Sequence, residues 1–116
     1  VLWANLAKAY DIAQSLPELE VVLAEASHDE NENTNMIRST TQAMAAVIGG
    51  ANRLVVRSAN NESNTFTRRI ARNVQHLLKM ESYLDRVVDP AAGSYYIEAL
   101  TNQLAEKAWG IFQVKV

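Results

Sequence analysis

The sequence contains no cysteine, which excludes disulfides, thiolate catalysis and cysteine-ligated zinc. It also lacks any run near the roughly 18 apolar residues of a membrane span, and any basic start followed by an apolar middle that would resemble a signal peptide. These absences favour a protein of a reducing compartment, by default the cytoplasm, without membrane association.

An excess of charge of either sign is missing too. The chain has 11 Lys and Arg against 13 Asp and Glu, for a net charge of -2, so we expect neither nucleic acid nor an anionic membrane as a partner. Its 48% hydrophobic and 21% charged residues are typical of a folded globular protein. At 116 residues it forms one modest domain or part of one, and we treat residues 1–116 as one partial domain.

The first residues favour a fragment. The chain starts without Met, and Val1, Leu2 and Trp3 already lie in an apolar helical pattern with no capping residue before them. We therefore expect a segment cut from a longer protein.

Alternating helical and extended patterns predict an α/β fold. Apolar residues at helical spacing predict a leading helix that ends near Ser15, because Pro17 disfavours helix in the residue before it. Short apolar runs predict strands at residues 19–26, 54–56 and 87–88, each typical of a parallel strand. A helix is predicted after each strand.

The predicted helices have distinct signals at their ends. Thr34 or Asn35 can cap the second helix, and Gly49-Gly50 ends it. An apolar stripe predicts that the fourth helix runs to about Gln113. The apolar stripe of the third helix consists of Phe66, Ile70, Val74, Leu77 and Leu78, and that of the fourth consists of Ile97, Leu100, Leu104, Ala108 and Ile111.

The strand centres lie near residues 22, 55 and 88, so a βα unit repeats about every 33 residues. Three such units after a leading helix indicate a barrel or a doubly wound sheet. Because three strands leave the outer sheet edges unpaired, we expect the segment to need further strands or a partner, and to self-associate by itself.

Three segments resemble motifs of the methylmalonyl-CoA mutase family, in the same order and spacing. They are residues 35–46 (NMIRSTTQAMAA), 69–73 (RIARN) and 89–98 (DPAAGSYYIE). The last is far more specific than a generic glycine-rich turn. The resemblance covers nearly the whole chain and implies the C-terminal part of a substrate-binding (β/α)8 TIM barrel.

The resemblance also implies a chemistry, the isomerisation of methylmalonyl-CoA and succinyl-CoA. In the family, the barrel threads acyl-CoA along its axis and adenosylcobalamin caps one end, so that radical chemistry proceeds in a closed cavity. The family's substrate-polarising His, Tyr and Arg lie in earlier barrel units, and its cobalt-ligating His lies in a separate domain. We therefore expect no catalytic residue in this chain, and neither activity nor cofactor binding from it alone.

Three segments depart from the family's catalytic members. Residues 27–33 (SHDENEN) replace a TSGWSLT-like loop, and residues 54–59 (LVVRSA) replace a stretch with a strand-end His. Gln42 stands where catalytic members carry a Glu near the corrin, whereas Ala46 keeps the family residue. By family position, Gln42 and Ala46 are the candidate cofactor-binding residues.

This pattern is similar to the small, non-catalytic subunit of heterodimeric mutases, which keeps the fold and stabilises a catalytic subunit. A fragment of such a subunit is the preferred hypothesis, with the catalytic subunit as partner. Two alternatives stay open: a fragment of a divergent catalytic chain, and an independent small α/β binding module that dimerises through its strand edges.

Other reactive side chains have simpler interpretations. His28 lies in an acidic loop without metal-ligand spacing, so we predict no metal site. His76 has no carboxylate at a triad-like position. A solvated basic helix face is favoured over a CoA phosphate site for Arg68, Arg69 and Arg72. Packing is favoured over ligand binding for Tyr95 and Tyr96, and a tight turn over catalysis for Asp89, Pro90, Gly93 and Ser94.

Overall fold

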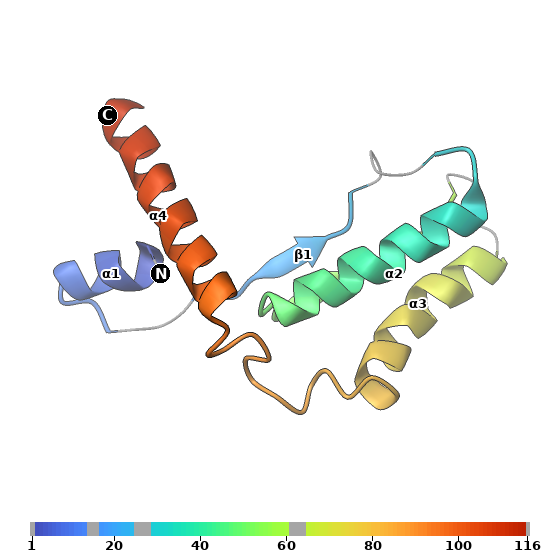
Figure 1. Cartoon of the computed structure of the whole chain (residues 1–116). Helices are drawn as coiled ribbons and strands as arrows, with labels where there is room; N and C mark the ends of the chain where they lie inside the picture. Colours follow the sequence, from blue (N-terminus) through green and yellow to red (C-terminus); the bar gives the residue numbers. More distant parts are fainter. Residues whose placement is uncertain (1, 14–16, 25–28, 61–64, 116) are drawn as a thin grey trace. The chain divides into compact units, whose positions relative to one another are not determined.

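The computed structural model describes residues 2–13, 17–24, 29–60 and 65–115. Its helices and strands are α1 (Leu2–Ala9), β1 (Glu20–Val22), α2 (Glu32–Ile48), β2 (Arg53–Val55), α3 (Thr65–Met80) and α4 (Tyr95–Lys115) (Figure 1). The chain divides into two compact units. One comprises Glu18–Pro90, and the other comprises Val1–Pro17 with Ala91–Val116.

The two strands form a parallel sheet, which confirms the α/β assignment. Val21 of β1 lies opposite Leu54 of β2. Just before the strands, the backbone N–H of Leu19 donates to the side-chain oxygen of Asn52 at 2.8 Å, across the same separation of 33 residues. The register of the sheet therefore equals the repeat that the sequence predicts.

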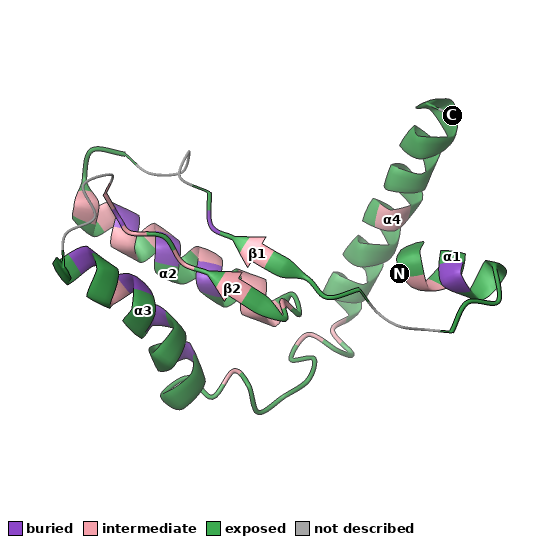
Figure 2. Cartoon of the chain, turned by 180° about the vertical axis from the view of Figure 1, so that it is seen from behind, coloured by how far each residue is buried: buried purple, intermediate pink, exposed green. Residues whose placement is uncertain are grey.

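The core of the Glu18–Pro90 unit lies where the helices meet the sheet. Helix α2 packs against both α3 and β2. The buried core residues of this unit are Leu23, Ala43, Val74 and Leu78, and the partly buried residues packed on them are Val21, Val47, Leu54, Val56, Ile70 and Leu84. Figure 2 shows the buried positions along α2 and α3. Apolar burial of this kind is the main favourable term in folding, so α2, α3 and the strands stabilise one another.

Helix α2 ends where the glycine pair predicts. Gly50 has a φ of 86°, in the left-handed region that glycine adopts readily. Its N–H donates to the carbonyl of Val47 at 3.0 Å, and the N–H of Ala51 donates to the carbonyl of Ala46 at 3.0 Å. These two bonds form a Schellman motif, so the predicted stop is confirmed.

The leading helix is shorter than predicted. It ends at Ala9, and Ser15 lies outside the described residues. Asp11 has a φ of 53°, and the N–H of Ile12 donates to the carbonyl of Ala7 at 3.0 Å. Asp tolerates the left-handed conformation better than most residues, so this local motif ends α1 before Pro17 can.

The predicted cap of α2 is wrong by one turn. The side chain of Asn31, not that of Thr34 or Asn35, caps the helix: it accepts from the N–H of Asn33 at 3.0 Å and from that of Thr34 at 3.1 Å. Asn35 points instead into the protein, where it is buried. Several cap-forming residues in a row make the start of a helix ambiguous in sequence.

The third predicted strand does not form in this structure. Val87 and Val88 lie outside any strand, and Val88 is fully exposed. A strand needs a neighbour for its backbone hydrogen bonds, and among the described residues β1 and β2 pair only with each other. The chain therefore builds two of the three predicted strands. The first is also shorter than residues 19–26, of which 25 and 26 lie outside the described part.

The apolar stripes of the last two helices are only partly buried. In α3, Val74 and Leu78 are buried as predicted, whereas Phe66 and Leu77 are 48% and 46% exposed. Helix α4 extends two residues beyond the predicted end near Gln113, and none of its described residues is buried. Among the residues described, no helix has both the length and the apolarity to cross a bilayer.

Candidate functional site

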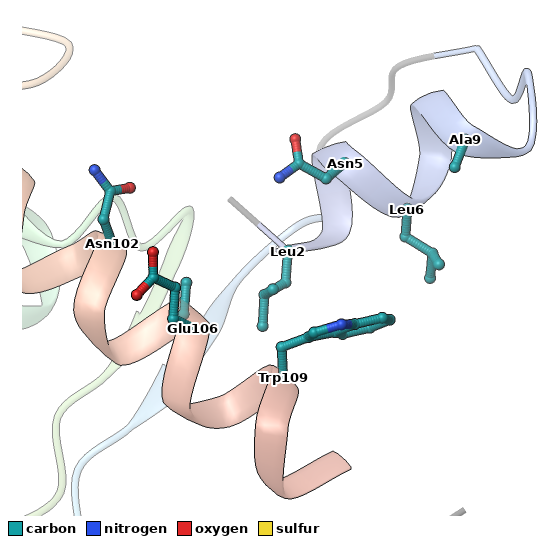
Figure 3. A pocket seen from close by; sticks show the side chains of 8 residues that line it. Leu2, Asn5, Leu6, Ala9, Asn102, Glu106 and Trp109 are labelled. Atoms are coloured by element: carbon teal, nitrogen blue, oxygen red, sulfur yellow. The ribbon is translucent and has the colours of Figure 1, made fainter. Parts of the chain in front are cut away.

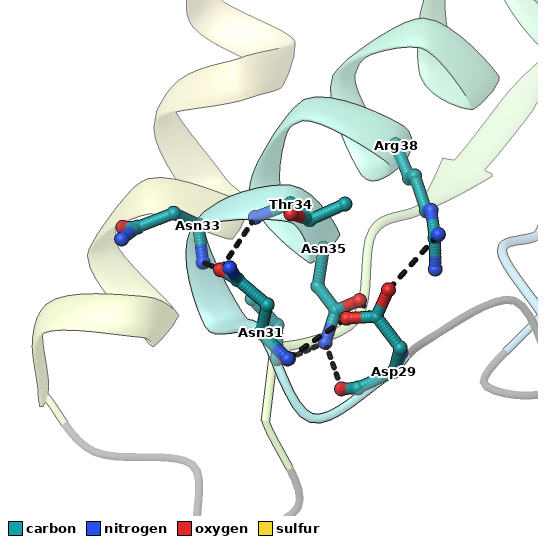
Figure 4. Close-up of polar contacts among 7 residues, drawn as sticks. Asp29, Asn31, Asn33, Thr34, Asn35 and Arg38 are labelled. Carbon is teal, nitrogen blue, oxygen red and sulfur yellow. Dashed lines mark hydrogen bonds and ion pairs between the residues drawn. The ribbon is translucent and has the colours of Figure 1, made fainter.

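The loops that follow β1 and β2 lie at the carboxyl end of the parallel sheet, the edge at which α/β proteins place their sites. Asn35, in the first turns of α2, joins these loops. Figure 4 shows its contact with Asp29. Its buried side-chain amide donates to the backbone carbonyls of Asp29 at 2.7 Å and Ala59 at 2.9 Å. Its side-chain oxygen accepts from the N–H of Asp29 at 2.8 Å. One polar side chain thus holds both loops.

The loop before α2 is further ordered by Asp29. One carboxylate oxygen of Asp29 accepts from the N–H of Asn31 at 2.8 Å. The other lies 2.9 Å from the guanidinium of Arg38 (Figure 4). Both side chains of this ion pair are partly exposed, so it positions the loop more than it stabilises the fold.

The loop after β2 is tied to both neighbouring helices. The hydroxyl of Ser58 donates to that of Thr67 at 2.7 Å, and Thr67 is fully buried in α3. The hydroxyl of Thr67 lies 3.4 Å from the side-chain oxygen of Asn60. The amide nitrogen of Asn60 in turn donates to the carboxylate of Glu32, in the first turn of α2, at 3.2 Å. We call these residues, with Asn35 and Ala59, the loop network.

The loop network determines what this edge can do chemically. Its carboxylate, amides and hydroxyls bond to one another or to backbone, and hydrogen-bonded polar groups of this kind order a site. Among the described residues, no group of three or more His, Asp or Glu side chains could hold a metal ion. His28 lies outside the described residues. No local sequence signal predicts the bonds from Asn35 to Ala59 and from Asn60 to Glu32, because they join residues 24 and 28 positions apart.

Gln42 and Ala46 lie one turn apart on α2, so they share one side of the helix. Both residues are partly buried, and the side-chain oxygen of Gln42 is buried. The neighbouring side chains Ala43 and Val47 belong to the core. The two candidate cofactor residues therefore lie at the margin of the core, largely covered by the chain itself.

The remaining sequence candidates are not among the residues of the loop network. His76 is exposed on α3. Tyr95 and Tyr96, predicted to pack, are instead 93% and 76% exposed in this structure. Gly93 has a φ of 79°, and the N–H of Ser94 donates to the carbonyl of Ala91 at 3.1 Å. This geometry confirms a turn before α4.

A groove that the sequence did not predict lies within the unit that contains α1 and α4. It has a volume of about 510 Å³. Figure 3 shows the side chains of Leu2 and Leu6, from α1, pointing towards the ring of Trp109, from α4. The lining residues are Leu2, Asn5, Leu6, Ala9, Asn102, Ala105, Glu106 and Trp109. Most of this lining is apolar, so the groove could accept only a largely apolar group.

Comparison with known proteins adds sequence relationships to this geometry. A family model described as methylmalonyl-CoA mutase matches residues 1–115. The methylmalonyl-CoA mutase small subunit of Porphyromonas gingivalis is 46% identical over 83 residues, which cover 69% of this chain and 13% of the relative. The methylmalonyl-CoA mutase of Rhizobium meliloti is 44% identical over 88 residues, which cover 73% of this chain and 12% of the relative. The methylmalonyl-CoA mutase small subunit of Streptomyces virginiae is 45% identical over 82 residues, which cover 68% of this chain and 13% of the relative. The chain thus spans a minor part of each relative's length.

Proposed function

The chain belongs to the methylmalonyl-CoA mutase family, and we propose that it is part of the substrate-binding barrel of a small, non-catalytic mutase subunit. In this role the full-length protein assembles in the cytoplasm with a catalytic subunit. The catalytic subunit holds adenosylcobalamin and acyl-CoA and isomerises methylmalonyl-CoA and succinyl-CoA. The small subunit stabilises it.

The repeat of the sheet supports the barrel. The partner residues of the two parallel strands are separated by 33 residues, which is a spacing typical of successive βα units. The same spacing after β2 leads to residues 86–88, which include the predicted third strand at Val87 and Val88. We propose that this segment becomes a strand when the rest of the barrel supplies its neighbours, because β-strands are stabilised by their pairing.

The loop network is the observation that carries the non-catalytic role. A catalytic edge needs polar groups aimed at a ligand. Here the amide of Asn35 donates to the backbone carbonyls of Asp29 and Ala59, and the hydroxyl of Ser58 donates to the hydroxyl of Thr67. Asp29 lies in residues 27–33 and Ser58 and Ala59 lie in residues 54–59, two of the segments that depart from the catalytic members in sequence, whereas Asn35 lies in the matching segment 35–46. Polar groups that bind one another order the loops, which suits a subunit whose role is assembly.

The surroundings of the two candidate cofactor residues support the same role. A corrin is a broad ring system that needs open surface on the protein. The Gln42 oxygen is buried, and Ala46 is partly covered. These residues do not fit a corrin in this arrangement of the chain, and we propose that the segment makes no productive contact with the cofactor.

A divergent catalytic chain is the second candidate function. Ala46 retains the family residue, and the Rhizobium meliloti mutase matches at 44% identity, close to the 46% of the Porphyromonas gingivalis small subunit. Sequence identity alone thus does not distinguish a non-catalytic subunit from a catalytic chain. The departures at residues 27–33, 42 and 54–59 favour the non-catalytic subunit.

Copurification of the full-length protein tests the proposal. The chain that carries this segment is expressed with a catalytic mutase subunit from the same source, and the complex is analysed by light scattering and isomerase assay. We expect a heterodimer that is active, and no turnover by the chain alone. Turnover by the purified chain alone would establish the catalytic alternative.

A further inference from the structure

The groove between α1 and α4 combines apolar and polar lining in one place. Figure 3 shows Asn102 and Glu106 towards one end of the groove, and Leu6 and the ring of Trp109 towards the other. The polar lining consists of Asn5, Asn102 and Glu106. We call these three residues the polar side chains of the groove. At about 510 Å³, the groove lies within the usual size range of small-molecule sites, roughly 300 to 1,000 Å³.

The polar side chains of the groove are not used within the protein. In the part of the chain that the structure describes, Glu106 forms no ion pair, and the side-chain amides of Asn5 and Asn102 form no hydrogen bond. The loop network differs in this respect, because its amides and hydroxyls bond to one another or to backbone. The oxygens of the groove are therefore available to a ligand.

The charge of the groove selects the sign of its ligand. Glu106 supplies a carboxylate, and none of the described residues that line the groove is Lys, Arg or His. A carboxylate without a basic neighbour in the lining attracts a cation and repels an anion. The groove therefore disfavours acyl-CoA, whose phosphate groups are negatively charged, and suits a different ligand from the one that the family binds.

We propose that the groove binds a primary alkylamine in its protonated form. An ammonium group has three N–H donors. The polar side chains of the groove offer three acceptors, which are the carboxylate of Glu106 and the amide oxygens of Asn5 and Asn102. Asn102 and Glu106 lie four residues apart, so they share one side of α4.

The apolar lining receives the alkyl chain of this ligand. The side chains of Leu6 and Trp109 are each 42% exposed. An alkyl chain that covers them removes apolar surface from water on both sides of the contact, which favours binding. A small inorganic cation would leave this surface exposed, so the lining favours an organic cation.

This site is separate from the loop network in position and in chemistry. The groove lies in the unit that contains Val1–Pro17 and Ala91–Val116, whereas the loop network lies in Glu18–Pro90. The proposal does not depend on the catalytic or non-catalytic role of the parent protein.

Calorimetric titration of the full-length chain with n-octylammonium tests the proposal. n-Octanol and n-octanoate have the same chain length with a neutral and a negatively charged head. The variant Glu106→Gln removes the charge of the groove and keeps the shape of the side chain. Glu98→Gln is the matched control, because it removes the charge of another exposed Glu on α4 that is outside the lining. Circular dichroism and the melting temperature establish that both variants are folded.

We expect the wild-type chain to bind n-octylammonium roughly three- to tenfold more tightly than n-octanol, and n-octanoate more weakly than either. In Glu106→Gln the preference for the ammonium should fall below about twofold, whereas Glu98→Gln should keep it. No binding of n-octylammonium, or equal or tighter binding of n-octanoate, would overturn the proposal. A preference that survives in Glu106→Gln, or is lost equally in Glu98→Gln, would overturn it as well.

Discussion

The side-chain amide of Asn35 donates a hydrogen bond of 2.9 Å to the backbone carbonyl of Ala59, 24 residues further along the chain. The bond joins the first turns of α2 to the loop that follows β2. Asn35 is almost completely buried, and unmade hydrogen bonds in a buried position cost more than they do at the surface. This contact is therefore central to the order of both loops.

Replacement of this residue tests its contribution. In Asn35→Ala, the carbonyls of Asp29 and Ala59 and the N–H of Asp29 all lose their side-chain partner. We expect the free energy of unfolding to fall by about 2 to 3 kcal/mol, since each group left unsatisfied costs roughly 1 to 3 kcal/mol and water can satisfy some of them. Urea unfolding of the full-length chain measures the change.

Asn33→Ala is the matched control, because it removes an exposed Asn from the same helix turn. We expect its effect to stay within about 0.5 kcal/mol. If both variants lose the same stability, the buried hydrogen bonds of Asn35 contribute no more than an exposed side chain does, and the loop network does not order this edge of the sheet.

Introducing a carboxyl at Gln42, in the variant Gln42→Glu, should destabilise this chain. The side-chain oxygen of Gln42 is buried, and burial raises the pKa of an introduced carboxyl above its ordinary value of about 4.3. Such a group costs nothing below the unfolded-state pKa, where it is protonated in both states. The penalty grows as pH rises from the unfolded-state pKa towards the raised folded-state pKa, is constant above that pKa, and reaches about 1 to 3 kcal/mol by pH 7.

Thermal unfolding between pH 4 and pH 7 measures this growing difference from the wild type. Gln75→Glu, at an exposed position of α3, is the control, and we expect it to change stability by less than about 0.5 kcal/mol across the range. A Gln42→Glu chain as stable as the wild type at pH 7 would mean that this position is open to solvent.

Two glycine-to-alanine variants should act in opposite directions. Gly50 has a φ of 86° at the end of α2, so Gly50→Ala should cost about 1 to 2 kcal/mol. Gly110 lies within α4, and a Cβ there would meet nothing within 4 Å. Gly110→Ala should stabilise the protein by up to about 1 kcal/mol through helix propensity. Melting temperatures that move in the same direction would contradict the role assigned to one of the two glycines.

The 116-residue chain by itself should self-associate. Large apolar side chains are exposed on several elements, including Val88, Trp109 and Ile111, and extended apolar surface promotes association. Analytical ultracentrifugation over a dilution series should give dimers or larger species that dissociate on dilution. A monomer at every concentration would show that these surfaces do not require a partner.

Sequence patterns predicted the local features of this fold well. The Gly49-Gly50 stop, the parallel strands and the spacing of 33 residues between them were predictable, because glycine conformation and short apolar runs act within a few residues. The start of α2 was missed because Asn31, Thr34 and Asn35 all have cap-forming side chains. The end of α1 depends on the left-handed conformation of Asp11, which Asp adopts far less regularly than glycine.

Features that depend on distant residues could not be predicted in the same way. Val87 and Val88 have the composition of a strand, but a strand also needs a neighbour, which a one-dimensional pattern does not supply. The bond from Asn35 to Ala59 and that from Asn60 to Glu32 join residues separated by 24 and 28 positions. Helical spacing placed Gln42 and Ala46 on one side of α2, but only the packing of the chain revealed how far they are covered.

Cobalamin binding tests the central claim, that this chain comes from a subunit that assembles with a catalytic partner and does not itself use the cofactor. Adenosylcobalamin is titrated into the full-length chain alone, the catalytic subunit alone and their mixture, and protein-bound cofactor is followed by its visible absorbance. We predict that cobalamin binds only in the samples that contain the catalytic subunit. Binding and turnover by the full-length chain alone would contradict this claim, because the segment would then belong to a catalytic mutase.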